Sequence, residues 1–405
     1  MPSQNRSDTL AAKKGLSAPV LSFLTMVIAA LVANLYYAQP LISSIGPDIG
    51  VSPELAGSIV SAAQVGYGLG LFFIVPLADL VETRLLVVIT LFGSIAGLFG
   101  IATAHSSGIF FLSSFVLGWS STAGQVLMLT IAHLTPIERR GRAIGSVMAG
   151  LLGGIMLARP LSLFVSGKFG WRGMFYGSGM FLVCCLLILV FVMPRRKPHG
   201  GMNYGHILTS MLRLLLDLPV VRRRAVYQGV LFCVFNMFWT TVPVLLETKF
   251  GMGSYSIGLF ALAGAGSTLA APWAGRQADR GYTAVTSLCS MFIVVGVLAL
   301  SGVAASFASL VGLLVCTILL DAGVQTNQIL SQRIVFSVPS AIGGRANGIY
   351  MTIMFVGGAL GSVLGTMLYH WGGWSAVAGG GTALSFLVLI LFIFEPRATK
   401  EIIDS

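Results

Sequence analysis

The sequence predicts an all-α membrane protein with twelve transmembrane helices arranged in two pseudo-symmetric six-helix bundles. Hydrophobic residues make up 56% of the 405-residue chain and charged residues 9%, and the mean hydropathy is +0.91. The segment that begins at Gly141-Arg142-Ala143 and ends at Gly170-Trp171 recurs as a segment from Gly344-Arg345-Ala346 to Gly373-Trp374. A repeat in so apolar a chain indicates a duplicated membrane unit rather than a soluble solenoid.

Apolar runs of membrane-spanning length occur in each half of the chain. A helix needs about 20 residues to cross a hydrocarbon core of about 30 Å. The runs lack the alternation of barrel strands, and backbone groups in lipid must be satisfied within the segment, so we expect helices. The first bundle is predicted within 19–193 and the second within 224–395. The spans are predicted at residues 19–43, 54–78, 84–104, 108–134, 141–166, 171–193, 224–247, 254–274, 283–304, 308–332, 343–370 and 373–395.

The distribution of basic residues predicts the orientation. Of the 24 Lys and Arg residues, all fall on one side of the predicted spans except Lys168, Arg172, Lys249 and the intramembrane Arg159. Because cytoplasmic loops carry the excess of Lys and Arg, the tails 1–18 and 396–405 and the linker 194–223 are predicted to be cytoplasmic. The protein is therefore expected in a bacterial cytoplasmic (inner) membrane, as a multi-pass protein.

The linker between the two bundles contains apolar residues among polar and basic ones. Their spacing favours a short interfacial helix, and a solvated linker without a helix is the alternative. The apolar positions are Ile207, Leu208, Met211, Leu212, Leu214 and Leu215.

Other classes of protein fit the sequence poorly. The positive charge lies on short loops at one membrane face, so we do not expect nucleic-acid binding. The five cysteines lie in apolar spans without a CxxC pair, which argues against disulfides and a zinc site. No GxSxG, P-loop or HExxH motif is present, so we expect neither an enzyme nor a cofactor or metal. The expected partners are the lipid bilayer, a small-molecule substrate and protons, and the protein is expected to be a monomer.

One motif occurs in both halves, after the second span of each. It reads Pro76-Leu77-Ala78-Asp79, followed by Arg84, and Gly275-Arg276-Gln277-Ala278-Asp279-Arg280-Gly281. Together with twelve helices in two parallel repeats, this motif resembles the Gly-x-x-x-Asp-Arg turn of the major facilitator superfamily. The resemblance implies secondary transport by alternating access. The first copy departs from the family pattern, with Val75 in place of Gly and Thr83 in place of Arg.

The resemblance also implies a gate at the cytoplasmic face. An Asp in a tight turn can interact with the positive N-terminal end of a helix in the other half and with a nearby Arg. Arg345 and Arg142 begin the eleventh and fifth spans and are the expected counterparts of Asp79 and Asp279. The alternative is that the two aspartates are solvated loop charges that serve only topology. The expected gating residues are Asp79, Arg84, Arg142, Asp279, Arg280 and Arg345.

Within the superfamily, the chain resembles the bacterial drug:proton antiporter and sugar-efflux branch. The resemblance rests on Asn34-Leu35-Tyr36-Tyr37-Ala38-Gln39-Pro40 and on Gly170-Trp171-Arg172-Gly173-Met174-Phe175. Two departures bear on proton exchange. Ser114 stands where many antiporters have an Arg, and Arg159-Pro160 replaces the Gly-Pro of the antiporter motif.

Polar residues inside the spans indicate a central cavity. Asp321 is the acidic residue well inside a predicted span, and charged groups at that depth usually face a cavity and carry function. Gln325, Gln328 and Gln332 follow at helical spacing and extend one polar stripe. We expect Asp321 to carry the coupling proton, and a structural carboxylate is the alternative.

Arg159 is the other intramembrane charge. A direct pair with Asp321 is left open, because the two predicted depths differ by about 8 Å at 1.5 Å per residue. The cavity is expected to suit a small amphipathic or hydroxylated solute better than a strongly anionic one. Each assignment competes with simple interhelical packing. The expected lining residues are Asn34, Tyr37, Gln64, Tyr67, Gln125, Arg159, Asn236, Trp239, Thr240, Gln325 and Gln328.

The sequence therefore predicts a secondary active transporter that exports a small amphipathic drug-like or sugar-like solute by proton antiport. Two alternatives stay open. One is a proton-coupled symporter or facilitator that imports a small metabolite. The other is a non-transporting membrane sensor or scaffold, which would need neither a duplicated gate motif nor a polar stripe.

Overall fold

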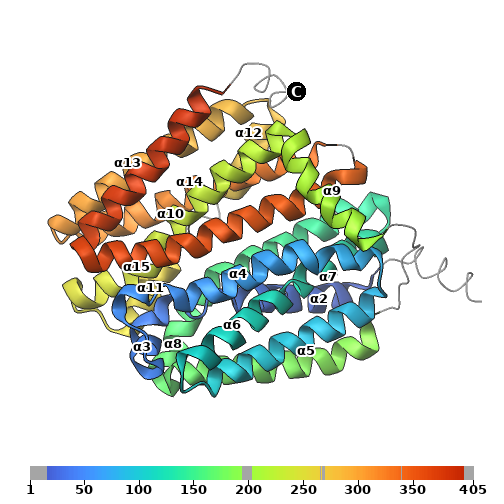
Figure 1. Cartoon of the computed structure of the whole chain (residues 1–405), viewed down its shortest axis with the longest axis horizontal. Helices are drawn as coiled ribbons and strands as arrows, with labels where there is room; N and C mark the ends of the chain where they lie inside the picture. Colours follow the sequence, from blue (N-terminus) through green and yellow to red (C-terminus); the bar gives the residue numbers. More distant parts are fainter. Residues whose placement is uncertain (1–15, 194–202, 265, 267–269, 339, 396–405) are drawn as a thin grey trace, which may run out of the picture.

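The computed structural model describes residues 16–193, 203–264, 266, 270–338 and 340–395. Every regular element in this part of the chain is a helix. Figure 1 shows two neighbouring bundles, coloured blue to green for the N-terminal helices and yellow to red for the C-terminal ones. Most of the predicted tail 1–18, all of the tail 396–405 and the first part of the predicted linker lie outside the described residues.

The helices follow the predicted division into two bundles and a linker. The N-terminal bundle contains α2 (Ala18–Ala33), α3 (Ile42–Ile49), α4 (Ser58–Phe73), α5 (Thr83–Ala102), α6 (Ser107–Ser121), α7 (Ala123–Leu134) and α8 (Ile137–Val192). The linker contains α9 (Tyr204–Asp217). The C-terminal bundle contains α10 (Pro219–Phe250), α11 (Ser254–Gly264), α12 (Ala270–Asp279), α13 (Thr283–Ser306), α14 (Leu310–Phe336) and α15 (Ser340–Ile393). Short 3₁₀ helices lie at η1 (Gln39–Leu41), η2 (Pro53–Leu55) and η3 (Val75–Asp79).

Two elements, α8 and α15, each contain a reversal of the chain. The backbone of α8 leaves the helical region at Gly170, where φ is 71°. Beyond Gly170, Tyr176 lies against Phe99 at one end of α5, and Val190 accepts a hydrogen bond from Arg84 at the other. The chain therefore runs back along α5. Glycine suits this turn because it adopts positive φ without a steric penalty, and Gly373 of α15 has a φ of 62°.

Eight of the described helices are long and apolar enough to cross a membrane, and two of these are the 52-residue segments 141–192 and 342–393. The shorter apolar helices are α2 and α11. Three predicted spans are interrupted: 19–43 after Ala33, 108–134 at Thr122, and 254–274 between α11 and α12. In the first of these, Pro40 cannot donate a backbone hydrogen bond, which favours a break in the helix.

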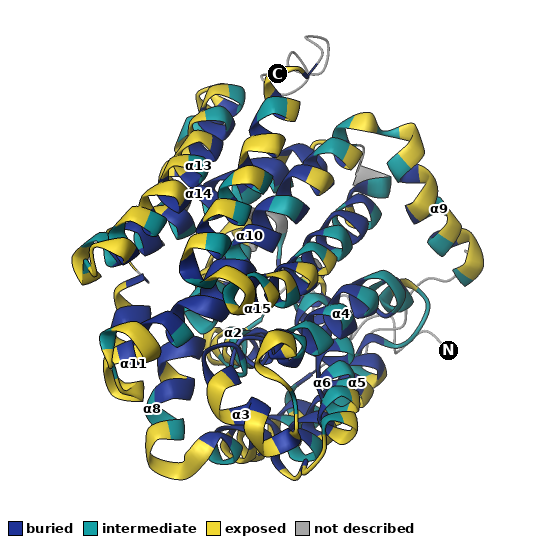
Figure 2. Cartoon of the chain, turned by 60° about the vertical axis from the view of Figure 1, so that its left-hand side comes forward, coloured by how far each residue is buried: buried dark blue, intermediate teal, exposed yellow. Residues whose placement is uncertain are grey.

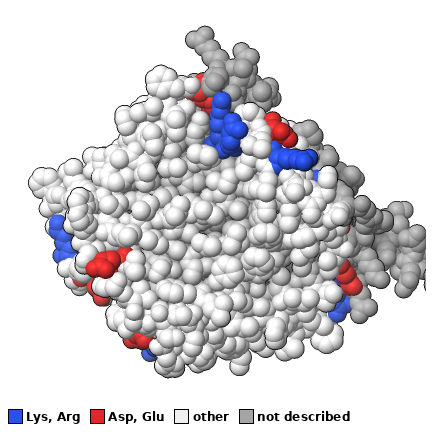
Figure 3. Space-filling view, in the orientation of Figure 1, with Lys and Arg blue, Asp and Glu red and all other residues white. Residues whose placement is uncertain are grey.

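The outward surfaces of the bundles are apolar. Large side chains such as Phe92, Phe292 and Val311 are exposed there, and Figure 2 shows exposed residues along the outer sides of α13 and α14. The face in Figure 3 has a broad uncharged band, with Lys, Arg, Asp and Glu at its margins. An exposed apolar surface of this extent is typical of contact with lipid.

Glycines bring the first and fifth spans of each bundle into backbone contact. A Cβ atom at Gly154 of α8 would lie 2.6 Å from the carbonyl oxygen of Ala29 in α2. The same relationship recurs in the second bundle, where a Cβ atom at Gly361 of α15 would lie 2.0 Å from the carbonyl oxygen of Cys233 in α10. Small residues allow such approach where lipid offers no hydrophobic drive for association.

Helices α4 and α15 form the main seam between the bundles. Thr352 Oγ1 donates to the carbonyl oxygen of Gly68 at 3.1 Å, and Ser61 Oγ donates to that of Ala359 at 2.5 Å. Near the start of α4, the Gly57 amide donates to Thr366 Oγ1 at 3.1 Å. The seam therefore runs along most of α4.

The two ends of the molecule differ in how the bundles meet. We call the end that carries α9 the linker face, and the other end the opposite face. On the opposite face, Phe164 of α8 packs on Tyr255 of α11, with ring centroids 5.3 Å apart, and His370 Nε2 lies 3.0 Å from Glu54 Oε1. These contacts close the opposite face.

On the linker face, the bundles are connected through α9. The Tyr204 hydroxyl donates to the carbonyl oxygen of Phe73 at 2.7 Å, and Arg345 Nη1 donates to Ser210 Oγ at 3.2 Å. Among the residues described, no hydrogen bond or ion pair links the linker-face ends of α7 and α8 to α12 or α14.

Candidate functional site

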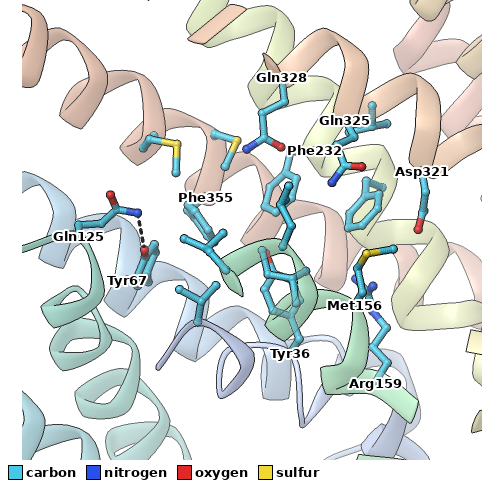
Figure 4. A pocket seen from close by; sticks show the side chains of 18 residues that line it. Tyr36, Tyr67, Gln125, Met156, Arg159, Phe232, Asp321, Gln325, Gln328 and Phe355 are labelled. Carbon is cyan, nitrogen blue, oxygen red and sulfur yellow. Dashed lines mark hydrogen bonds between the residues drawn. The ribbon is translucent and has the colours of Figure 1, made fainter. Parts of the chain in front are cut away.

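A cavity of about 110 Å³ lies between the two bundles. Its walls come from α4, α7, α8, α10, α14, α15 and the chain at the end of α2, so both bundles contribute (Figure 4). The aromatic lining residues are Tyr36, Tyr67, Phe232, Phe235 and Phe355. The amide and charged lining residues are Gln125, Arg159, Asp321, Gln325 and Gln328.

Arg159 of α8 is the central cation of this site and is only 4% exposed. Its Nε donates to Gln39 Oε1 at 2.9 Å. Its Cζ lies 4.1 Å from the ring centroid of Trp239 and 5.2 Å from that of Phe235. A guanidinium stays protonated in proteins, so these cation–π contacts and the hydrogen bond offset part of the cost of burying it.

Gln39 reaches Arg159 because the first span is not one continuous helix. Helix α2 ends at Ala33, and the chain turns before η1 begins at Gln39. Irregular backbone at membrane depth is tolerated where it is buried in protein or lines a cavity. Here the turn places Tyr36 5.3 Å from Arg159 Cζ. It also leaves Gln39 fully buried.

Asp321 of α14 faces the same cavity from the other bundle. Its Oδ1 accepts a hydrogen bond from Trp239 Nε1 at 2.7 Å. Trp239 therefore lies between the two charges, with its ring against Arg159 and its N–H on Asp321 (Figure 4). The ion pairs found within 4.0 Å among the described residues do not include Arg159 with Asp321. The question left open by the sequence is thus answered for this conformation.

The polar stripe of α14 lies along the cavity for two helical turns. Gln325 and Gln328 line it together with Asp321. Gln332, one turn further, instead donates to Met351 Sδ at 3.3 Å. The helical spacing in the sequence thus identified three residues that share one cavity.

A second set of polar side chains joins the bundles beside Arg159. We call Gln39, Gln64, Asn236 and Thr240 the amide network, and all four are fully buried. Asn236 Oδ1 accepts from Gln64 Nε2 at 2.6 Å and from Gln39 Nε2 at 3.1 Å. Gln39 Nε2 also lies 3.3 Å from Thr240 Oγ1. These bonds link the N-terminal bundle to α10.

Two predicted lining residues, Asn34 and Tyr37, lie elsewhere. Asn34 Oδ1 accepts from Ser178 Oγ at 2.6 Å, and Tyr37 lines an apolar groove between α2 and α8. The prediction placed them on one helical face, but the chain has left the helix by residue 34. Tyr36 and Gln39 face Arg159 in their place, and Pro40 was the signal in the sequence that could have identified them.

Tyr67 and Gln125 line the cavity on the N-terminal side. Gln125 Nε2 donates to the Tyr67 hydroxyl at 3.3 Å, the bond drawn in Figure 4. The Tyr67 ring packs edge-on against Phe355 of α15, with centroids 4.6 Å apart. This pair therefore belongs to both the cavity wall and the seam.

The residues expected to form a gate lie at the linker face. Asp279 forms an ion pair with Arg333 of α14, within its own bundle. Arg84 donates to the carbonyl oxygen of Val190, and Arg345 donates to Ser210 of α9. The remaining members of the set, Asp79, Arg142 and Arg280, are exposed. The expected gate contacts concern a conformation closed on this face, so they stay a prediction.

Residues 21–343 match the Major Facilitator Superfamily. The chain is 32% identical over 380 residues to the uncharacterized transporter YgaY of Escherichia coli O157:H7, covering 93% of this chain and 95% of that protein. It is 25% identical over 289 residues to the chloramphenicol resistance protein of Streptomyces lividans, covering 68% and 71% of the two chains.

Solved structures give the same fold. The inward-open conformation of the xylose transporter XylE from E. coli matches with a TM-score of 0.71 at 14% identity, over 93% of this chain and 96% of that one. The sequence match extends over most of the chain, and its two bundles are those of the solved transporters. The chain is therefore a multi-pass membrane transporter that belongs to the Major Facilitator Superfamily, and not an enzyme.

Proposed function

We propose that the protein couples the movement of a small amphipathic solute to protons, through alternating access of the central cavity, and that Asp321 carries the coupling proton. The observation that carries the proposal is the position of Asp321. It is the acidic residue among the described lining residues, and it lies between two bundles that must move relative to each other. A carboxyl group at this depth is costly unless it has a function.

Export in exchange for protons is the direction we propose. The resemblance to the drug:proton antiporter branch supports it, and so does the similarity to a chloramphenicol resistance protein. The cavity walls of aromatic rings and amides suit an amphipathic solute. We further propose that the linker face is cytoplasmic, since the basic loops lie there. The conformation is then the inward-facing one.

Import by proton symport is a second candidate, favoured by Arg159. This residue keeps its charge, so the empty site with ionised Asp321 has no net charge. A proton on Asp321 together with an anionic solute on Arg159 again gives no net charge, which is favourable in a poorly solvated cavity. A cationic solute would add a positive charge beside Arg159.

The coupling role is tested with Asp321→Asn, which keeps the size of the side chain but cannot titrate. A ligand is first identified by thermal shift in a screen of small solutes that includes chloramphenicol and xylose. In proteoliposomes, the wild-type protein should move this ligand when a pH gradient is imposed. The direction of movement relative to the gradient separates antiport from symport.

The Asp321→Asn variant should lose gradient-driven movement while keeping ligand binding and counterflow. Glu247→Gln, a change at an exposed carboxylate, serves as the matched control and should behave as wild type. Undiminished gradient-driven transport by Asp321→Asn would exclude this residue as the proton carrier. Binding without flux in the wild-type protein would favour a sensor or scaffold.

A further inference from the structure

The two terminal nitrogens of Arg159 are the polar groups of the cavity that the protein leaves without an acceptor. Nη2 is buried and has no hydrogen-bond partner among the described residues, and none is described for Nη1. Buried donors of this kind are rare, because an unsatisfied charged donor costs more than a neutral one, for which the cost is about 1–3 kcal/mol. The arrangement points to an acceptor supplied from outside the chain.

The surroundings of Arg159 leave one direction open to such an acceptor. Gln39 occupies the Nε edge, and the rings of Trp239 and Phe235 cover the guanidinium. The Nη1–Nη2 end is the remaining edge, and Arg159 lines the cavity. Two parallel N–H groups at this edge match the two oxygens of a carboxylate.

We propose that the cavity recognises a small organic monoanion, whose carboxylate binds the Nη1–Nη2 end of Arg159 and whose short apolar or aromatic body packs on the cavity rings. This inference rests on the proposed function and names the class of solute for the same site. A single Arg fits a single negative charge, which agrees with the expectation that strongly anionic solutes bind poorly.

The size of the cavity limits the solute further. Its volume of about 110 Å³ is below the 300–1,000 Å³ typical of pockets for drug-sized ligands. Phe232 and Phe355 provide an apolar wall, and Gln325 and Gln328 provide amides on the α14 side. A carboxylate with a body of one ring or a short chain therefore fits best in this conformation.

Asp321 is the charged group that an incoming carboxylate would meet. Across the cavity it faces Arg159 of α8 and Tyr36 after α2, with Trp239 of α10 as its hydrogen-bond donor. Its own negative charge repels an anion and attracts the guanidinium. Removing that charge is therefore expected to strengthen anion binding, whereas removing Arg159 is expected to abolish it.

The test uses three probes of the same shape and different charge: benzoate, benzamide and benzylamine. Binding to the purified full-length protein is followed by tryptophan fluorescence and thermal shift, since Trp239 borders the site. Benzoate should bind saturably, and at least tenfold more tightly than benzamide or benzylamine. Equal binding of the three probes, tighter binding of benzylamine, or no benzoate binding at millimolar concentration would overturn the proposal.

Variants separate the role of Arg159 from a general structural one. Arg159→Gln should weaken benzoate binding more than tenfold, and Arg159→Lys, which keeps the charge but not the fork, should give an intermediate loss. Asp321→Asn should bind benzoate at least as tightly as wild type. If Arg159→Gln does not fold, the ranking of probes in the wild type and the Lys variant decide the question. Unchanged benzoate binding in the Lys and Gln variants, or its loss in Asp321→Asn, would contradict the proposal.

The outcome can be told apart from the fate of the proposed function. Benzoate binding without any flux driven by a pH gradient would remove proton coupling and leave the recognition of anions intact. Gradient-driven flux of a neutral or cationic solute, in a protein that does not bind benzoate, would leave coupling intact and remove the recognition of anions.

Discussion

Arg159 and Ser362 occupy equivalent positions in the two halves and are the two ends of one chain of hydrogen bonds. They are separated by the same 203 positions as Gly170 and Gly373. Arg159 Nε donates to Gln39, whose amide lies within hydrogen-bond distance of Thr240 Oγ1. Thr240 Oγ1 lies 3.2 Å from Ser362 Oγ. The duplicated position thus carries a charge in one bundle and a hydroxyl in the other.

The amide network predicts how the opposite face opens. Asn236→Ala removes the acceptor of Gln64 and Gln39, which would leave buried amide donors unsatisfied at a cost of about 1–3 kcal/mol in the present conformation. We expect the population to shift toward a conformation open on the opposite face. Spin labels at Ser52 and Trp371, in a variant without native cysteines, should report longer distances.

Thr241→Val is the control for this experiment. Its hydroxyl bonds only to carbonyl oxygens of α10 in the described structure, so the distances should stay as in wild type. Identical distance distributions in Asn236→Ala and Thr241→Val would show that the amide network does not hold the bundles together.

The duplicated Asp motif predicts an effect on the linker face. Asp279→Asn and Asp79→Asn should each destabilise the conformation closed on that face, because an Asp at a helix N-terminus contributes about 0.3–1 kcal/mol, and up to about 2 kcal/mol when partly buried. Distances between spin labels at Ser146 and Ser337 should shift toward the open population.

Asp279 also contacts Arg333 in the open conformation, so Arg333→Gln is measured alongside. A shift in Asp279→Asn that Arg333→Gln reproduces in full would assign the effect to the pair within the bundle instead of the gate. No shift in either Asp variant would leave both aspartates as topology signals.

The orientation is tested by labelling the two termini, since the bias of basic residues predicts that both are cytoplasmic. Single cysteines at Ser3 and Ser405, in a background without native cysteines, should react with a membrane-impermeant maleimide only after the membrane is opened. Labelling of intact cells at either site would mean an odd number of crossings or the reverse orientation.

The contact of Asp48 with the chain reversal in α8 predicts a pH-dependent stability. Trp171 Nε1 donates to Asp48 Oδ2 at 2.9 Å and Arg172 Nη1 donates to it at 2.6 Å. The hydrogen bond from Trp171, followed by that from Arg172, lowers the pKa of Asp48 below its usual value. The folded state therefore favours the ionised carboxylate.

Because the pKa is lower in the folded state, the contribution is complete above the unfolded value of about 3.9 and is lost as the pH falls through the folded value. Asp48→Asn should lower the midpoint of thermal unfolding at pH 7, by the small amount of about 0.2–1 kcal/mol expected of a solvent-exposed pair. The difference from wild type should shrink below pH 4, and Glu247→Gln should show no such trend. A constant difference at all pH values would contradict the assignment.

The sequence predicted the bundles and part of the site for identifiable reasons. Asp321, Gln325 and Gln328 could be found because α14 is continuous there, so the helical period determines which side chains share a face. Arg159 could be found because a charge inside a span is rare and usually functional.

Other parts of the site could not be predicted because they depend on the path of the chain. Once α2 ends at Ala33, helical spacing no longer tells which way Tyr36, Tyr37 and Gln39 point. The bridging position of Trp239 depends on how α10 packs against both α8 and α14, which a single sequence does not reveal. Tryptophan in an apolar span is also typical of plain packing.

The seam between α4 and α15 determines which part of the molecule can act as the doorway for the solute. Bonds such as those of Thr352 with Gly68 and of Ser61 with Ala359 hold these two helices together along their length. Phe164 and Tyr255, by contrast, join α8 to α11 only at the opposite face. The seam therefore serves as the axle about which the bundles rock, and a solute enters and leaves beside α8 instead of through the seam.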